Sequence, residues 1–252
     1  MKKRGARLGQ HFLADRRVQQ RILEALHLTP EDLVIEIGAG RGAMTGLLAE
    51  HAGRVVAVEV DPRLAAELRE KFRGHPRVEI VEGDILTLPL EYPRARVFGN
   101  LPYYITSPIL MRLFARAAQF DEIVVMVQKE VAQRLAAAPG SRTYGLLSVT
   151  ARFYTRPELL FTIPPGAFRP APQVDSALVR MRVAPHGPPD EGFFRFLRAA
   201  FHQKRKRLVN NLKALYGAER VKQAMERSGL PMGARAEEMS LEQFQALFLL
   251  LT

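Results

Sequence analysis

An amide side chain, a turn-forming proline and two aromatic residues directly follow a short apolar run at residues 95–99. The motif consists of Asn100, Leu101, Pro102, Tyr103 and Tyr104. Ligands of α/β sheets bind at the carboxyl ends of strands, so polar and aromatic groups placed there indicate a binding site. Pro102 disfavours helical conformations at Leu101, which leaves the Leu101 carbonyl outside any helical hydrogen-bond ladder.

The motif suits the exocyclic amino group of adenine. The Asn100 side-chain oxygen and the Leu101 carbonyl could accept both amino hydrogens while a tyrosine stacks on the ring. Two acceptors favour the pyramidal amine with a localised lone pair, and they stabilise the positive charge that develops as the nitrogen takes up a methyl group. A plain strand-to-helix turn with an Asn cap and packed tyrosines explains the same residues equally well.

The elements that would position this motif alternate between strand and helix up to about residue 135. Such alternation predicts a parallel sheet with helices on both faces. Short apolar runs predict buried strands at residues 33–37, 54–60, 78–81, 96–98 and 122–127. Two later segments, 146–154 and 177–183, also have strand character, and a proline-rich stretch at 163–173 separates them.

The pattern changes after residue 183. A linker rich in proline and glycine at 185–189 is followed by segments that are all helical in pattern. Ser240 and Gln243 form a capping-box signature for the last of them. We therefore predict two domains, a sheet domain at 1–184 with a basic N-terminal arm and a helical domain at 185–252. The predicted helices cover residues 191–202, 204–216, 219–228 and 241–251.

A glycine cluster at residues 38–42 lies between the first predicted strand and the first helix of the sheet. Glycines let the backbone approach a nucleotide-like ligand closely, and the start of the helix offers unpaired amides. The spacing of Gly38, Gly40 and Ala43 also satisfies the dinucleotide fingerprint, and Glu59 stands where a ribose-binding acid belongs. A nicotinamide enzyme is therefore one open alternative.

Three further features favour S-adenosylmethionine over a dinucleotide. Glu36 directly precedes the glycines, Asp84 ends the third strand, and the Asn100 motif follows the fourth. This methyl donor carries an adenosine and an amino-acid end but no pyrophosphate. Glu59 suits its ribose hydroxyls and Asp84 its adenine amino group, while residues 38–42 suit its amino-acid portion.

The chain is basic, with 37 Lys and Arg against 26 Asp and Glu, a formal net charge of +11. This excess favours a polyanionic partner, nucleic acid first and an anionic membrane surface second. Solvated helix faces can also carry runs of charge. The basic residues concentrate in two blocks: Lys2, Lys3, Arg4, Arg7, Arg16, Arg17 and Arg21, and then Arg195, Arg198, Lys204, Arg205, Lys206, Arg207 and Lys213.

Composition excludes several classes of protein. The chain contains no cysteine, which rules out disulfides and thiol chemistry, and no apolar run is long enough to span a membrane. No apolar segment follows the basic start, so it does not read as a secretory signal. We expect a cytoplasmic protein that is monomeric, does not bind membranes and needs no metal.

Several segments together resemble the rRNA adenine N6-methyltransferase family, and within it the bacterial small-subunit adenine dimethyltransferases. The glycine cluster is generic to methyltransferases, whereas the segments around residues 9–13, 168–176 and 201–206 are specific to the family. The matching segments are Leu8–Leu13, Glu36–Gly42, Glu59–Asp61, Gly83–Asp84, Asn100–Ile105, Phe168–Ser176 and Phe201–Lys206.

This resemblance implies a Rossmann-like class I methyltransferase sheet of seven mostly parallel strands with a small helical C-terminal domain. It implies dimethylation of two adjacent adenines in the 3′-terminal hairpin loop of 16S rRNA, with a role in small-subunit biogenesis, and small-subunit rRNA or the assembling 30S subunit as partner. By position, the donor would contact His11, where the family often has Asn, and Leu13, Gly38, Gly40, Glu59, Asp84 and Asn100.

The resemblance also assigns the target and RNA sites. The target amine would lie among Asn100, Leu101, Pro102 and Tyr103, so these are the expected catalytic residues. Loop adenines are already partly unstacked, which lowers the cost of flipping one into a pocket. The basic blocks would bind phosphates without reading sequence. The expected RNA-binding residues are Lys3, Arg4, Arg7, Lys204, Arg205, Lys206 and Arg207.

Three alternatives to the small-subunit enzyme remain. A large-subunit adenine methyltransferase of the resistance type has the same chemistry, but the 168–176 segment and the basic C-terminal block favour the small subunit. An assembly factor that only holds RNA would not need the intact motif at 100–103. A nicotinamide oxidoreductase would have no use for two polycationic blocks.

Overall fold

The structure is a computed structural model that describes residues 10–92, 94–187 and 190–252. The chain forms two compact units. The first consists of residues up to Ala132 together with Arg156–Val183, and the second of Gln133–Thr155 together with Ala184–Thr252. The second unit thus includes all of the chain from Ala184 onward, next to the predicted boundary. It also includes Gln133–Thr155, which we had placed in the first domain. Whether the two predicted domains have separate functions stays a prediction.

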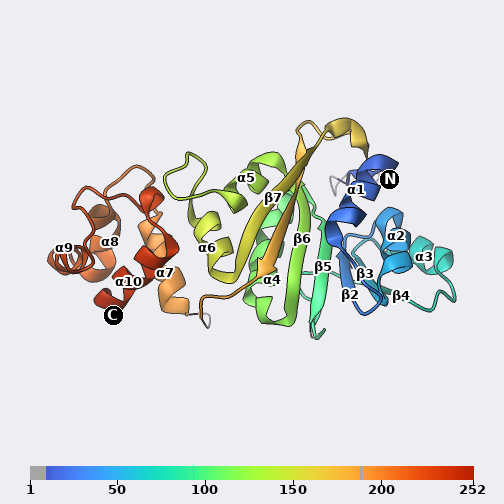
Figure 1. Ribbon diagram of the computed structural model, residues 1–252, viewed down its shortest axis with the longest axis horizontal. Coiled ribbons are helices and arrows are strands. Elements are labelled where there is room, and N and C mark those ends of the chain that lie inside the picture. The colour runs from blue at the N-terminus through green and yellow to red at the C-terminus, as the bar shows by residue number, and fades with distance from the viewer. Residues whose placement is uncertain (1–9, 93, 188–189) are drawn as a thin grey trace, which may run out of the picture. The chain divides into compact units, whose positions relative to one another are not determined.

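The first unit is built on a seven-stranded sheet with the order β4-β3-β2-β5-β6-β9-β7 (Figure 1). Strands β2 to β6 are mutually parallel where they pair, and β9 runs antiparallel to β6. This confirms the predicted methyltransferase sheet. The strands are β2 (Leu33–Ile37), β3 (Arg54–Glu59), β4 (Val78–Glu82), β5 (Ala95–Asn100), β6 (Phe120–Gln128), β7 (Thr155–Ile163) and β9 (Ser176–Val183).

Helices cover both faces of the sheet. Apolar side chains of α1 (Arg16–Leu26) and α2 (Ala43–His51) share a core with Val34, Val55 and Phe98 on one face. Leu68 of α3 (Pro62–Lys71) packs on Ala57, which points to the same face as Val55 because strand side chains alternate. On the other face, α4 (Thr106–Ala115) places Ile109 beside Ile37 and Val58.

Aspartate side chains cap the starts of two helices in this unit. The side chain of Asp15 accepts hydrogen bonds from the amides of Arg17 and Val18 and so caps α1. Asp61 caps α3 in the same way, with Pro62 as the first helical residue. Each cap fixes where the chain turns from the sheet edge into a helix.

The strand order reverses between β2 and β5. From β2 the chain proceeds through β3 to β4 on one side, and then returns to place β5 and β6 on the other. Ligands of open α/β sheets bind in the crevice outside the carboxyl ends of the strands at such a switch point. Gly38 and Asn100 stand at this place, since Ile37 pairs with Gly99.

A two-stranded ladder brings the N-terminal segment to the carboxyl ends of the parallel strands, the carboxyl edge of the sheet. Strand β1 (Phe12–Leu13) pairs antiparallel with β8 (Phe168–Arg169). The imidazole Nδ1 of His11 also lies 2.8 Å from the carbonyl oxygen of Pro170. Residues 10–13 are therefore held by a segment that lies more than 150 positions further along the chain.

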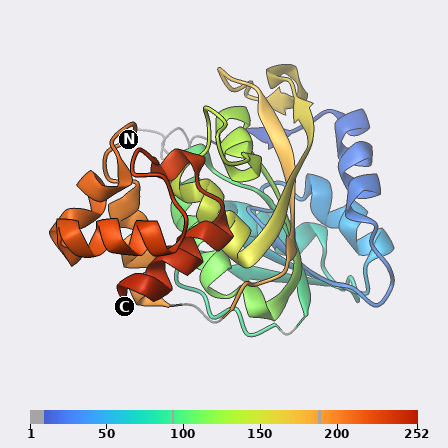
Figure 2. The same ribbon diagram turned by 60° about the vertical axis from the view of Figure 1, so that its left-hand side comes forward.

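The second unit is helical (Figure 2). The buried Tyr144 donates a hydrogen bond of 2.7 Å to the Met239 carbonyl, and the rings of Phe193, Phe196 and Phe244 lie in its core. Ser240 and Gln243 form the predicted capping box. Besides the end of α5 (Lys129–Ala136), its helices are α6 (Leu146–Tyr154), α7 (Glu191–Ala200), α8 (Leu208–Tyr216), α9 (Ala218–Arg227) and α10 (Leu241–Leu251).

The predicted strand at residues 146–154 is wrong, because this segment is the helix α6. Its side chains are buried almost all around, and a short apolar run of this kind fits a buried strand as well as a buried helix. The hydroxyl of Ser148 accepts from the Gly145 amide at 3.1 Å and donates to the Arg134 carbonyl at 2.5 Å, which fixes the helix start. The following strand, β7, was missed.

The amino ends of the parallel strands form the opposite edge of the sheet, the amino edge. This edge carries a network of charged side chains. Arg96, Glu122 and Arg182 occupy register positions across β5, β6 and β9. A carboxylate oxygen of Glu122 lies 2.7 Å from Arg96 and the other lies 3.2 Å from Arg180. Arg96 also donates to the His27 carbonyl at the end of α1 and pairs with Asp32 at 3.1 Å. These charges thus pair with one another and with the last carbonyls of a helix.

Candidate functional site

The turn after β2 depends on glycine at position 38. Gly38 has φ +74°, and a Cβ at this position would lie 3.3 Å from the Asn100 carbonyl oxygen. Its amide donates to the Val58 carbonyl at 2.9 Å. The positive φ and the close approach both favour glycine, so the turn is locked against the ends of two neighbouring strands.

Glu59, the last residue of β3, is buried and its carboxylate is tied to the backbone on both sides. One oxygen accepts from the Gly40 amide at 2.7 Å and the other from the Asp61 amide at 3.0 Å. A carboxylate oxygen can accept more than one hydrogen bond. Glu59 is therefore fixed in place and still able to accept from two hydroxyls of a ribose.

Glu36 lies beneath the glycine turn and is almost completely buried. Its pKa is raised to about 8, chiefly by burial and in smaller part by the neighbouring Glu59, while a 2.5 Å hydrogen bond from Thr45 opposes the shift. The ammonium group of Lys71 donates to the carbonyls of Arg41 and Gly42 and so holds the turn from the α3 side. Glu36 does not line the pocket described below.

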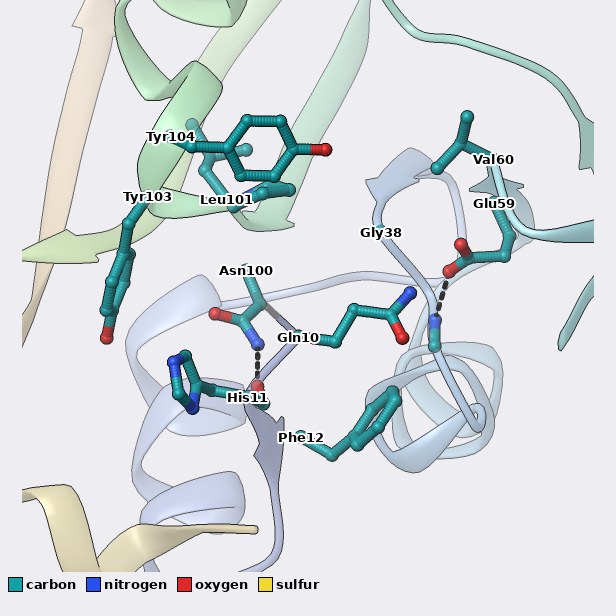
Figure 3. Close-up of a pocket in the computed structure, with 12 residues that line it drawn as sticks. Gln10, His11, Phe12, Gly38, Glu59, Val60, Asn100, Leu101, Tyr103 and Tyr104 are labelled. Atoms are coloured by element: carbon teal, nitrogen blue, oxygen red, sulfur yellow. Dashed lines mark hydrogen bonds between the residues drawn. The ribbon is translucent and has the colours of Figure 1, made fainter. Parts of the chain in front are cut away.

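The amide of Asn100 has a defined orientation. Its Nδ2 donates to the His11 carbonyl at 2.9 Å, which turns Oδ1 toward the space bounded by His11 and Tyr103 (Figure 3). The Leu101 amide donates to the Met126 carbonyl at 3.0 Å. Within the described part of the chain no hydrogen bond ends on the Leu101 carbonyl. One amide oxygen and one main-chain carbonyl are thus left as acceptors, as the motif predicts.

The two tyrosines of the motif differ in how they are held. The Tyr103 hydroxyl lies 2.6 Å from the Ser176 hydroxyl, and its ring centroid lies 5.5 Å from that of His11. Burial raises the pKa of Tyr103, so the phenol stays neutral. Tyr104 is 58% exposed. Tyr103 is therefore the ring with a fixed orientation.

Two adjoining pockets meet at this edge of the sheet and share Gly38, Val60, Pro102 and Tyr104. The first contains the Asn100 motif and Glu59 (Figure 3). The second contains Asp84, whose Oδ1 accepts from the Leu86 amide at 2.9 Å, together with apolar groups such as Ile85 and Ile109. A donor with a ribose at Glu59 and an adenine toward Asp84 fits across the two.

The structure brings together most of the predicted site residues. Those that line the two pockets are His11, Gly38, Gly40, Glu59, Asp84, Asn100, Leu101, Pro102 and Tyr103. Leu13 lines neither pocket, because its side chain is buried in the core beneath α1. The predicted contact of Leu13 with the donor stays a prediction.

Sequence reasoning missed Gln10, Phe12 and Val60 as residues of the first pocket, whereas Tyr104 belongs to the predicted motif. Phe12 forms a wall, since a Cβ on Gly40 would lie 3.0 Å from its ring. Val60 is 47% exposed although it follows a buried strand. Its place after Glu59 was a signal, because an apolar residue exposed at the end of a parallel strand suits a flat ring.

The predicted RNA-binding residues fall into two groups. Lys3, Arg4 and Arg7 lie outside the described residues. Lys204, Arg205, Lys206 and Arg207 are all exposed, in the loop between α7 and α8. The Lys204 ammonium donates to the Arg142 carbonyl at 3.1 Å, and Asn211 donates to the Ala200 and Gln203 carbonyls. The loop thus has its own hydrogen-bonded frame while its cations face solvent.

Residues 10–92, 94–187 and 190–252 contain no group of three or more His, Cys, Asp or Glu side chains arranged to hold a metal ion. None of the helices in those ranges is long and apolar enough to cross a membrane.

Known proteins resemble the chain over its whole length. The model of a family described as ribosomal RNA adenine dimethylase matches residues 1–252. Ribosomal RNA small subunit methyltransferase A of Koribacter versatilis is 46% identical over 264 residues, covering 96% of this chain and 93% of that protein. The protein of the same name from Pelotomaculum thermopropionicum is 40% identical over 261 residues, with 95% and 88% covered.

Solved structures share the fold. The 23S rRNA methyltransferase ErmE is 30% identical with a TM-score of 0.74, covering 95% of this chain and 99% of that one. A dimethyladenosine transferase from Plasmodium falciparum has a TM-score of 0.81 at 24% identity, with 94% and 96% covered, and supports the fold alone. With a family model that spans the chain, the chain belongs to the ribosomal RNA adenine dimethylase family, and the predicted adenine methyl transfer, methyl donor and rRNA substrate are those of this family.

Proposed function

We propose that this chain transfers methyl groups from S-adenosylmethionine to the N6 amino groups of two adjacent adenines in the 3′-terminal hairpin loop of small-subunit (16S) rRNA. The observation that carries the proposal is the pair of acceptors at Asn100 and Leu101 beside the fixed ring of Tyr103. A primary aromatic amine has two hydrogens to match this pair. The proposed cellular setting is the cytoplasm, with the assembling 30S subunit as partner and the enzyme as a monomer.

The residues around the donor pocket fit S-adenosylmethionine. When bound, this donor supplies an electrophilic methyl group on a sulfonium. Glu59 would accept from the ribose hydroxyls, Asp84 would bind the adenine amino group, and the turn at Gly38 and Gly40 would leave room for the amino-acid end. His11 and Asn100 would border the donor from the target side.

The target residues would act on the amine itself. The Asn100 oxygen and the Leu101 carbonyl would accept its two N–H groups, which localises the nitrogen lone pair for attack on the methyl carbon. As the nitrogen gains the methyl group it becomes positively charged, and both acceptors stabilise that charge. One N6 proton then leaves to solvent, and the former sulfonium is released as a neutral thioether.

The small subunit is the proposed substrate because of the relatives. The proteins that are 46% and 40% identical to this chain are named for the small subunit, whereas the 23S enzyme ErmE is 30% identical. The site geometry supports adenine chemistry on either RNA. A large-subunit target is therefore the second candidate, and it rests on the structural likeness to ErmE.

The deciding experiment offers labelled S-adenosylmethionine with unmodified small and large ribosomal subunits in parallel, followed by nucleoside analysis. Dimethyladenosine on the small subunit alone is the expected result. Label on the large subunit alone would move the chain to the second candidate. Donor binding without transfer to either would contradict the enzymatic proposal.

The basic loop between α7 and α8 would bind RNA phosphates. Replacing Lys204, Arg205, Lys206 and Arg207 by serine should weaken subunit binding and reduce its dependence on salt, because each phosphate contact releases counterions. A matched control replaces Arg63, Arg69, Arg73 and Arg94, which are exposed cations of the sheet unit outside both blocks. Equal salt slopes in both variants would contradict a specific role of the loop.

A further inference from the structure

Ser176 has no role in the function proposed so far, yet its hydroxyl contacts Tyr103, a residue that lines the first pocket. The residue is fully buried and its Oγ lies 2.6 Å from the Tyr103 hydroxyl. It does not line the pocket itself. Ser176 therefore contacts a pocket residue rather than the ligand.

The sheet holds Ser176 in a fixed place relative to Asn100. Ser176 is the first residue of β9 and pairs with Gln128 of β6, while Asn100 pairs with Met126 of the same strand. The Lys129 amide donates to the Asp175 carbonyl at 2.9 Å, and their side chains form an ion pair of 3.0 Å. Pairing with strand β6 thus fixes the backbone positions of both Ser176 and Asn100.

The orientation of the Tyr103 side chain depends on such a fixed contact more than that of Asn100 does. It begins a three-residue 3-10 turn, and its only described ring neighbour is His11, at a tilt of 32°. A tyrosine ring that carries no hydroxyl contact can rotate about its side-chain bonds. The bond to Ser176 fixes the position of the far end of the ring.

We propose that Ser176 is a positioning residue that holds the Tyr103 ring against the target base, and that this bond matters more for the second methyl transfer than for the first. The inference rests on the proposed function, because it concerns the same site. Ser176 acts through Tyr103 and touches neither the donor nor the base.

The difference between the two transfers follows from counting hydrogens. In the first, the amine offers two N–H groups, so the Asn100 oxygen and the Leu101 carbonyl both orient it. In the second, the amine has one methyl group and one N–H, so one of these hydrogen bonds is lost. In this second transfer, stacking on Tyr103 must therefore supply more of the orientation of the base. In each transfer the nitrogen gains a methyl carbon, the carbon–sulfur bond breaks, and one N6 proton leaves to solvent.

The test compares Tyr103→Phe, Ser176→Ala and the double variant, using unmodified small subunits and S-adenosylmethionine. Single-turnover time courses resolve monomethyladenosine and dimethyladenosine. Each single variant should slow the second transfer about 3- to 10-fold, the loss expected for one hydrogen bond, and slow the first transfer less. The double variant should lose the same factor and not its square, because both substitutions remove one bond.

The matched control is Thr155→Val, which removes another buried hydroxyl and its bond to the Ala151 carbonyl. It should leave the ratio of the two rates unchanged. Donor affinity, measured by calorimetry, should be the same in all variants. Tyr103→Phe keeps the ring and tests the split between the two transfers even if Ser176→Ala fails to fold.

The outcomes separate this inference from the proposed function. Equal slowing of both transfers, or losses that multiply in the double variant, would overturn the role of Ser176 while the wild-type enzyme remains active. Absence of any transfer by the wild-type protein would instead overturn the proposed function. Accumulation of monomethyladenosine in both single variants is the supporting result.

Discussion

The two edges of the central sheet use polar residues in opposite ways. At the amino edge, Glu122 is enclosed by the guanidinium groups of Arg96 and Arg180, so charge is paired with charge. At the carboxyl edge, Glu59 and Asn100 bond to the backbone and keep further acceptor capacity. Charged groups that pair with one another stabilise the fold. Polar groups that the backbone orients, and that keep free acceptor oxygens, can bind a ligand.

Helix α1 connects the two edges. It starts at Arg16, just after the segment that borders the pocket, and its last carbonyls accept from Arg96 and Arg180. Cations at a helix C-terminus are favourable because of the partial negative charge there. Because the polar groups at the two edges have different partners, a change in the charge network should mainly affect stability, and a change at Asn100 should mainly affect methyl transfer.

The largest effect is expected at the carboxyl edge. Asn100→Ala should reduce methyl transfer about 100- to 1,000-fold, because it removes an acceptor that acts mainly in the transition state. Donor binding, measured by calorimetry, should change little. A companion variant, Asn100→Asp, keeps an oxygen but cannot donate to the His11 carbonyl, so it should also lose activity. Equal loss of donor binding and transfer in Asn100→Ala would contradict the assignment.

At the amino edge the expected effect is on stability. Glu122→Gln leaves the buried Arg180 and the partly buried Arg96 without their shared counter-charge and should lower the free energy of unfolding by about 3 kcal/mol. Transfer at saturating substrate should stay near wild type below the unfolding transition. Urea unfolding measures the first property and single-turnover kinetics the second.

The control for Glu122→Gln is an exposed ion pair on the same sheet. Glu79 pairs with Arg54 at 2.5 Å, with side chains 43% and 55% exposed. Glu79→Gln should cost less than about 1 kcal/mol, because exposed pairs contribute little. Similar losses in the two variants would remove the distinction between buried and exposed charge at this edge.

Glu36 gives the carboxyl edge a dependence of stability on pH. Its pKa is raised from 4.5 to about 8, chiefly by burial, so the folded protein holds this proton more tightly than the unfolded chain. The contribution is complete below pH 4.5 and is lost as pH rises through about 8, at up to about 1.4 kcal/mol per pH unit in between.

Glu36→Gln cannot ionise and should keep the hydrogen bond from Thr45. The variant should therefore gain stability relative to the wild type as pH rises from about 5 to about 8. Urea unfolding at several pH values measures the difference. A constant difference over this range would show that Glu36 is not the titrating group.

The smallest effect is expected at a helix cap beside the site. The Asp61 side chain accepts from the Arg63 amide at 2.9 Å and caps α3. Asp61→Ala should cost about 1 kcal/mol of unfolding free energy and leave transfer unchanged, since the Asp61 backbone amide that holds Glu59 remains. A large loss of donor binding would mean that the cap also orients Glu59.

The carboxyl edge was more predictable from sequence than the amino edge. Each of Gly38, Glu59, Asp84 and Asn100 stands just after an apolar run, and parallel strands bring such ends together. Arg96, Glu122 and Arg180 stand inside the runs, and their pairing depends on the register between strands, which the sequence pattern does not give.

One wrong prediction and two missed pocket residues have physical causes. Helix α6 was predicted as a strand because a short apolar run can form either a buried strand or a helix that is buried on nearly all sides. The contact of Leu13 with the donor, which rests on family position, stays a prediction; along β1 the side chain of Leu13 lies in the core, whereas Phe12 lines the pocket. Gln10 and Phe12 reach the site through pairing with β8, a contact too distant in sequence to be predicted.

The pairing of residues 12–13 with residues 168–169 has a consequence for synthesis. A chain that grows from its N-terminus cannot form the bond between His11 and Pro170, 159 positions apart, until almost the entire first unit has been made. Contacts of such high sequence separation form late and carry a large loop-closure cost. Nascent chains that end before residue 168 should therefore lack a complete pocket, and methyl transfer should begin only after most of the first unit has been translated.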